Sequence, residues 1–187
     1  MPNGGIEREH IFHEEHRWEP IHVSLISQEG LPMATDERWV FGHALHVENR
    51  QVGTFERSTL YSRLTLREGQ SNWLLAAVPA PNVTEGWLIS AVKVRYTLAG
   101  GEGGAGQPGL IDAVGIRDGE AVVTSFENLT AGSVTGWQNL ELSLGGAHYR
   151  FGLAVSIHAN YPVPLGTTQV LPPVEYRVVG VGLAFTR

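Results

Sequence analysis

The chain has no cysteine, a single lysine and no long run of apolar residues, and each of these shortages excludes a class of protein. Without cysteine there is no disulfide framework. A formal net charge of -6, with Lys93 as the one lysine, argues against a nucleic-acid partner, because neutralising phosphates requires clustered positive charge. No apolar segment approaches the roughly 20 residues that span a bilayer, so we expect no membrane partner. The first residues also lack the basic and apolar regions of a secretory signal, which favours a cytoplasmic location.

What the chain has in abundance is alternation of apolar and polar residues. In the stretch from Tyr149 to Ala159 the odd positions as far as Ile157 are large and apolar, whereas the even positions are small or polar. A two-residue period is typical of a strand with one buried face. This strand must therefore lie against a second apolar layer.

Similar patterns predict further strands within residues 39–47, 60–66, 73–78, 92–96, 114–116, 121–125, 140–144 and 174–185. Trp39 and Phe41 in the first of these strands, and Leu60 in the second, belong to apolar faces that we expect to be half-buried. Asp118-Gly119 predicts a type I′ hairpin, and Gly145-Gly146 predicts a second hairpin that leads into the strand at Tyr149. Apolar residues change parity within 174–185, so we expect a bulge near Val178 to Gly180.

No segment has a convincing helical period, and glycine or proline separates the expected strands. The fold class is therefore all-β. We predict an antiparallel β-sandwich, of jelly-roll type, and keep a closed antiparallel β-barrel as the alternative. A chain of 187 residues suits one such domain, which we place at residues 39–187.

Residues 1–38 form an acidic, histidine-rich arm with eight acidic residues against three arginines. Within it Ile21, Val23 and Leu25 alternate with polar residues after Pro20, which predicts a strand over residues 21–27. We expect this strand to pair with a sheet edge, chiefly in a homo-oligomer.

Histidines in the arm invite a metal hypothesis, since His10, His13, Glu14 and His16 have helical spacing. A solvated polar arm explains them more simply, because metal sites are normally anchored on a rigid scaffold. His43 and His46, three apart on a strand, face opposite sides of the sheet. We therefore predict neither a metal nor a cofactor.

Four stretches carry a resemblance to a known family: Trp39 to Glu48, Gly69 to Trp73, Val78 to Pro81, and the Ile111 to Gly119 hairpin. From about Arg38 to the C-terminus the chain resembles a family of small uncharacterised bacterial β-sandwich domains of unknown function. The resemblance implies the fold and no activity. Where such domains carry histidine before the first glycine this chain has Phe41, which speaks against a shared histidine site.

Few residues suggest chemistry. Ser156 and His158 share an outward face with Arg150, and with Asp112 as the acid they could be a nucleophile and its base. However, residues two apart on a strand lie about 7 Å apart at the backbone, and the sequence contains no oxyanion loop. Asp112 and Glu141 as a glycosidase pair lack any cue for a raised pKa. Trp87 and Trp137 differ in parity from their apolar neighbours, so both could point outward and stack on a sugar or line an interface.

Three functions remain open from the sequence. The first is a non-catalytic binding or self-assembly domain that oligomerises through its arm. The second is a carbohydrate or small-ligand binding module using Trp87, Trp137, Arg150, Ser156 and His158. The third is an enzyme with a site in the mouth of the sandwich or barrel, capped by the arm, although the sequence favours a protein without catalysis.

Overall fold

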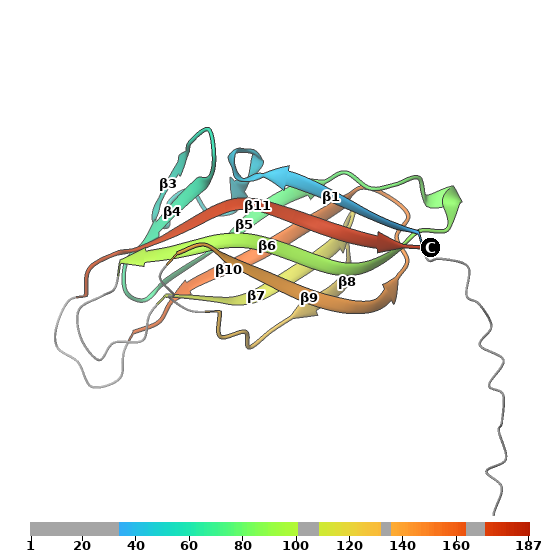
Figure 1. Cartoon of the computed structure of the whole chain (residues 1–187). Helices are drawn as coiled ribbons and strands as arrows, with labels where there is room; N and C mark the ends of the chain where they lie inside the picture. The colour runs from blue at the N-terminus through green and yellow to red at the C-terminus, as the bar shows by residue number, and fades with distance from the viewer. Residues whose placement is uncertain (1–33, 101–108, 132–135, 164–170) are drawn as a thin grey trace, which may run out of the picture. The chain divides into compact units, whose positions relative to one another are not determined.

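The structure is a computed structural model that describes residues 34–100, 109–131, 136–163 and 171–187 (Figure 1). These residues form strands and two short 3-10 helices, with the following bounds: β1 (Thr35–Phe41), η1 (Gly42–Ala44), β2 (His46–Val47), β3 (Thr54–Arg57), β4 (Ser62–Leu66), β5 (Gln70–Val78), η2 (Val83–Glu85), β6 (Leu88–Gly100), β7 (Leu110–Asp118), β8 (Ala121–Phe126), β9 (Gln138–Ala147), β10 (Leu153–Tyr161) and β11 (Val174–Thr186). No helix in the described residues is long and apolar enough to cross a membrane.

The strands form two open antiparallel sheets. Sheet A has six strands in the order β3-β4-β11-β6-β9, with β1 also paired to β11, and sheet B has five in the order β2-β5-β10-β7-β8. Figure 1 shows sheet A, with β1, β11, β6 and β9, in front of sheet B. The predicted antiparallel β-sandwich is confirmed, and the described strands form no closed barrel.

Strand pairing identifies the sandwich as a jelly roll. Among the eight strands β4 to β11, the first pairs with the last, and the remaining partners follow inward in the same way: β5 with β10, β6 with β9 and β7 with β8. This is the pattern of a long antiparallel ribbon folded over on itself, which places successive pairs in alternating sheets. Strands β1, β2 and β3 extend the sheets beyond this eight-strand unit.

The interior is filled from both sheets by the alternation that the sequence shows. Val92, Val94 and Tyr96 of β6 are buried, as are Val155 and Ile157 of β10. In β11 the buried set changes parity across a register shift between Val178 and Gly180. The predicted bulge is thus confirmed, and it keeps both halves of β11 facing the core.

The expectation that a strand begins at Tyr149 is wrong. Strand β10 starts at Leu153, and the side chain of Phe151 is 70% exposed. The cause is Asp118, whose carboxylate accepts hydrogen bonds from the backbone N–H groups of Arg150 (2.6 Å) and Phe151 (2.7 Å). These bonds hold the two residues outside the ladder, so alternation does not extend to Phe151.

Two predicted hairpins have different outcomes. Strands β7 and β8 do form a hairpin, but its turn residues are Gly119 and Glu120, with positive φ at Gly119 alone, so the turn is not type I′. The Gly145-Gly146 hairpin is wrong, because β9 lies in sheet A and β10 lies in sheet B. Alternation reports which face of a strand is buried but not which sheet the strand joins.

The N-terminal stretches also differ from expectation. Strand β1 starts at Thr35 and pairs along β11, so residues 35–38 extend the sandwich past the boundary predicted at residue 39. Trp39, Phe41 and Leu60 were expected to be half-buried on the core side, yet they are 42%, 66% and 70% exposed. The predicted strand at residues 21–27, with Ile21, Val23 and Leu25, and the arm histidines lie outside the described residues.

Candidate functional site

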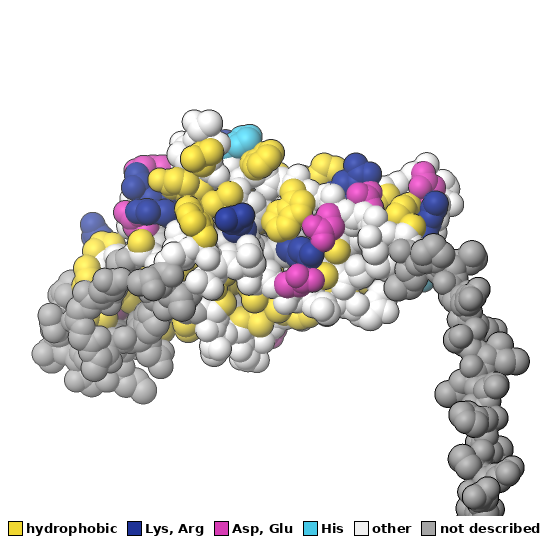
Figure 2. Space-filling view, in the orientation of Figure 1, with side chains coloured by type: hydrophobic (Ala, Val, Ile, Leu, Met, Phe, Trp, Pro, Cys, Tyr) yellow, Lys and Arg dark blue, Asp and Glu magenta, His cyan; other side chains and the backbone are white. Residues whose placement is uncertain are grey.

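Exposed aromatic side chains gather on the outer face of sheet A. Trp39 and Trp137 are 42% and 45% exposed, and Phe41 is 66% exposed. Half-buried Tyr61 lies beside Trp137, with ring centroids 6.3 Å apart. We call these four residues the aromatic face. Figure 2, in the same orientation, shows hydrophobic side chains interspersed with charges of both signs over this part of the molecule.

The indole of Trp39 lies directly on the backbone of β11. Trp39 pairs with Gly182, and a Cβ added at Gly182 would come within 2.7 Å of indole Cδ2 and 2.9 Å of Cε2. A Cβ at Gly180 would also meet the ring, at 3.4 Å from Cε3. The two glycines therefore form a floor without side chains on which the indole rests.

A short chain of ionic contacts fixes the indole in place. Trp39 Nε1 donates to Glu37 Oε2 at 3.2 Å, and Lys93 Nζ donates to the other oxygen of Glu37 at 2.5 Å. The hydrogen bond from Lys93 lowers the pKa of the Glu37 carboxyl, and that same bond raises the pKa of Lys93. Lys93 also lies 3.6 Å from Glu141. These contacts fix the orientation of the Trp39 indole, which we call the platform.

A hollow of about 240 Å³ lies next to this platform, at the bulge of β11. Its lining is mostly apolar and comprises Trp39, Val40, Phe41, Arg95, Asn139, Val179 and Gly180. Gly180 is paired to both Phe41 and Arg95, and Arg95 is paired to Asn139, so these residues form one row across four strands. Arg95 has no ion-pair partner among the described residues. The hollow therefore combines aromatic walls with a free guanidinium and an amide.

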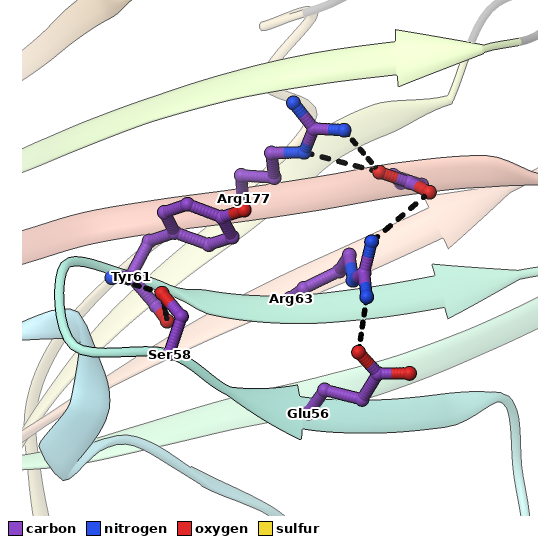
Figure 3. A network of polar contacts seen from close by, with 6 residues as sticks. Glu56, Ser58, Tyr61, Arg63 and Arg177 are labelled. Carbon is purple, nitrogen blue, oxygen red and sulfur yellow. Dashed lines mark hydrogen bonds and ion pairs between the residues drawn. The ribbon is translucent and has the colours of Figure 1, made fainter.

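Beside the hollow a polar network holds Tyr61 (Figure 3). The guanidinium of Arg177 lies 5.8 Å from the Tyr61 ring centroid and donates to Glu175 at 2.5 Å. Glu175 also lies 3.6 Å from Arg63, which is paired to Glu56. The carboxylates near the aromatic face, including Glu37 and Glu141, are thus each paired with a cation.

A larger hollow of about 440 Å³ lies beside β2 and β3 but is less suited to a site. It is lined by His46, Val47, Arg50, Phe55 and Arg57. Arg57 already donates to the carbonyl of Leu45 at 3.1 Å and contacts His46 Nδ1 at 2.9 Å. Two of the polar side chains that line this hollow, those of His46 and Arg57, therefore already contact each other.

The outer face of sheet B brings together His158 and Asp112, as the sequence suggested they could meet. His158 Nδ1 lies 2.5 Å from Asp112 Oδ1, and Asn160 Nδ2 donates to Asp112 Oδ2 at 2.8 Å. Trp73 lies against the His158 ring, with centroids 4.6 Å apart. Ser156 does not join them: it is 8% exposed, and its hydroxyl donates to the carbonyl of Gly115. The nucleophilic set considered from the sequence is therefore not assembled.

The other residues singled out from the sequence lie apart. Trp137 points outward and belongs to the aromatic face, near the Tyr96 end of β6. Trp87 lies just before Leu88, the first residue of β6. Its indole N–H donates to Glu85, and the guanidinium of Arg187 lies 5.0 Å from the centroid of its ring. Arg150 lies at the turn held by Asp118.

The two carboxylates of the considered glycosidase pair lie in different sheets, Glu141 on β9 and Asp112 on β7, so that pair is excluded. Among the described residues, no group of three or more His, Cys, Asp and Glu side chains could hold a metal ion.

Sequence reasoning missed most of the aromatic face and its hollow, including Trp39, Phe41, Tyr61, Arg95 and Asn139. Parity alone pointed Trp39 and Phe41 inward. The available signal was the pair Gly180 and Gly182, two apart in an otherwise apolar strand, which is a pattern that leaves room for a side chain from a neighbouring strand.

No family model matches the chain, and no curated protein matches it in sequence. Several solved structures are similar in fold. A low-affinity xylan-binding module, CBM86, from Roseburia intestinalis has a TM-score of 0.44 at 10% identity, covering 79% of this chain and 94% of that one. A family 29 carbohydrate-binding module has a TM-score of 0.46 at 8% identity, covering 81% and 92%. TmCBM61, solved with β-1,4-galactotriose, has a TM-score of 0.41 at 12% identity, covering 81% and 87%. At TM-scores below 0.5 these likenesses do not bear on what this chain binds.

Proposed function

We propose that this protein is a non-catalytic carbohydrate-binding module that holds a glycan on the aromatic face of sheet A. The observation that carries the proposal is the Trp39 indole, which rests on Gly180 and Gly182 and is 42% exposed. The C–H faces of a pyranose ring are apolar and pack on aromatic rings, whereas its hydroxyl groups need hydrogen-bond partners at the rim.

The hollow at the bulge offers both kinds of contact. Trp39 and Phe41 supply apolar surface, and Arg95 and Asn139 supply donors and an acceptor in the same row of the sheet. A protein partner would gain most from a broad apolar patch, but here the aromatic rings are interleaved with charged and amide groups. A polar ligand with flat apolar faces matches this arrangement better.

The carboxylates near the hollow favour binding over catalysis. A glycosidase needs one carboxyl group with a raised pKa as its acid, and a second within about 5–10 Å as nucleophile or base. On this face Glu37 has a lowered pKa because Lys93 donates to it, and Glu175 is held by Arg177. Carboxylates that are paired with cations in this way suit the positioning of other side chains.

The test is retardation of the full-length protein in native gels containing arabinoxylan, β-glucan, galactan, glucomannan or polygalacturonate, followed by calorimetry with the polysaccharide that retards it most. We expect Trp39→Ala to weaken binding tenfold or more, the loss typical of a central aromatic contact, which is about 1.4 kcal/mol or more. Phe41→Ala should weaken it less, because Phe41 is at the rim.

Matched controls lie elsewhere on the chain. Phe151→Ala removes a phenyl ring with exposure similar to that of Phe41, and Trp87→Ala removes an indole at the opposite end of β6. Both should bind like the wild type. The proposal is wrong if none of the five polysaccharides retards the wild-type protein, or if folded Trp39→Ala keeps the wild-type affinity.

A further inference from the structure

The outer face of sheet B carries a second constellation, which the aromatic face does not use. It is organised around Asp112, which sits in a bulge of β7: His158 pairs with Ala113 and Ala159 pairs with Ile111, so Asp112 has no partner on β10. A bulge interrupts the ladder and re-aims one side chain, and bulges of this kind are common next to binding sites. Here the re-aimed side chain is a carboxylate.

Both oxygens of that carboxylate are used to position neighbours. Oδ1 contacts His158 Nδ1 at 2.5 Å, and Oδ2 accepts from Asn160 Nδ2 at 2.8 Å. His158 and Asn160 are two apart on β10, so they project from the same face. From inside the sandwich, the Tyr176 hydroxyl donates to the backbone carbonyl of Asn160 at 2.6 Å, which ties this site to sheet A.

These contacts decide which atoms remain available. In the tautomer in which Nδ1 donates to Asp112, Nε2 of His158 is left as an acceptor. Asn160 donates through Nδ2, so its Oδ1 also remains an acceptor. Neither atom has a hydrogen-bond partner within the described part of the chain. The side chains of His158 and Asp112 are 21% and 25% exposed, so solvent and ligands reach the cluster.

Half-buried Trp73 completes the site. It lies directly opposite His158 in the pairing of β5 with β10, and its indole packs against the imidazole at a centroid distance of 4.6 Å. The cluster therefore presents two adjacent acceptors next to an aromatic surface. Neighbouring hydroxyl groups of a sugar ring are the donors that such a pair of acceptors fits, and the indole accommodates the apolar face of the ring.

We propose that Trp73, His158, Asn160 and the positioning residue Asp112 form a second glycan-binding site, so that one molecule holds two glycan chains on opposite faces. The choice of ligand class rests on the function proposed above, but the site is separate, because it lies on the outer side of the other sheet. A protein with two such faces cross-links soluble polysaccharide, which a single-site module cannot do.

The test is calorimetry of the full-length protein with a hexasaccharide of the polysaccharide that retards it most, for example xylohexaose for arabinoxylan, cellohexaose for β-glucan or mannohexaose for glucomannan. We expect two binding sites per chain for the hexasaccharide that binds. Trp39→Ala should leave one site, Trp73→Ala should leave the other, and the double variant should bind none. Wild-type protein should also turn a polysaccharide solution turbid, whereas either single variant should not.

A conservative substitution separates binding from a merely structural role. His158→Asn keeps a donor close to the position of Nδ1 for Asp112 but removes the Nε2 acceptor. We expect it to melt like the wild type yet lose at least tenfold in affinity at the second site. His158→Gln, which carries its amide near the position of Nε2, should restore part of that affinity.

The outcomes distinguish the two proposals. If calorimetry finds one site, which is lost in Trp39→Ala and unchanged in Trp73→Ala and His158→Asn, the second site is overturned and the aromatic face is supported. One site, lost in Trp73→Ala and unchanged in Trp39→Ala, overturns the aromatic face and supports the second site. No binding of any hexasaccharide by the wild type contradicts both.

Discussion

The two sheets each contain a β-bulge beside a candidate site on the outer face, and the two bulges have different consequences. On sheet A the bulge of β11 brings Val179 and Gly180 into the lining of a hollow beside Trp39 and Phe41. On sheet B the bulge of β7 pushes Asp112 outward, and the interruption becomes a polar anchor for His158 and Asn160. Whether a bulge yields a cavity or a hydrogen-bonding group depends on the residue that occupies it.

The two faces also differ in how their key ring is held. Trp39 is supported from below by glycine backbone and at its N–H by exposed Glu37. His158 is held by the half-buried carboxylate of Asp112 on one side and by the indole of Trp73 on the other. Stacking on glycine is sensitive to added atoms, whereas a hydrogen-bonded anchor is sensitive to loss of one partner.

The largest expected effect comes from the core that both faces share. Leu153→Ala removes a side chain that is 2% exposed, and we expect a loss of about 2–5 kcal/mol in the free energy of unfolding. Phe151→Ala, two residues away on the same parity, should change it by less than about 0.5 kcal/mol, because that ring is exposed. Denaturant titration of the two variants checks this. Equal losses would mean that Phe151 packs in the core after all.

A smaller effect should separate the faces. Gly182→Ala adds a Cβ that overlaps the Trp39 ring, so we expect a loss of stability of about 1–3 kcal/mol and a weaker site on sheet A alone. Gly145→Ala is the matched control, since a Cβ there meets nothing within 4 Å. Thermal melting and calorimetry measure both quantities. If Gly182→Ala is as stable as Gly145→Ala and binds glycan normally, Trp39 does not rest on the glycine floor.

The smallest effect concerns pH. The pKa of Glu37 is lowered by the bond from Lys93, so the pairing is present above the usual glutamate pKa of about 4.3 and is lost as pH falls through the lowered folded value. We expect affinity at the aromatic face to fall by less than about threefold on acidification, because exposed pairs contribute little.

Binding measured from pH 7 to pH 3 checks the pH effect, with Glu37→Gln as the variant that should lack this component. A fall of equal size in Glu37→Gln would assign the dependence to another group.

Much of the fold follows from local pattern, and most of the sites do not. The change of apolar parity in β11 was enough to predict its bulge, and the outward position of Trp137 followed from its neighbours. The crossing from β9 to β10 and the turn at Phe151 depended on contacts with distant segments, such as the Asp118 side chain.

The sites depend on such contacts even more. Trp39 meets Gly182 across more than a hundred residues of sequence, and Asp112 meets His158 only because β7 and β10 are neighbours. Alternation gives the side of the sheet for each residue, but strand order decides which residues meet.

The most direct measurement is an NMR titration of the indole N–H signals with the glycan that retards the protein most. The chain has five tryptophans, and each signal can be assigned by single substitution. We predict that the Trp39 and Trp137 signals shift at the concentrations at which binding occurs, that Trp73 shifts as the second site fills, and that Trp87 stays unchanged. A titration that moves Trp87 and leaves Trp39 and Trp137 in place would contradict the assignment of glycan binding to the aromatic face.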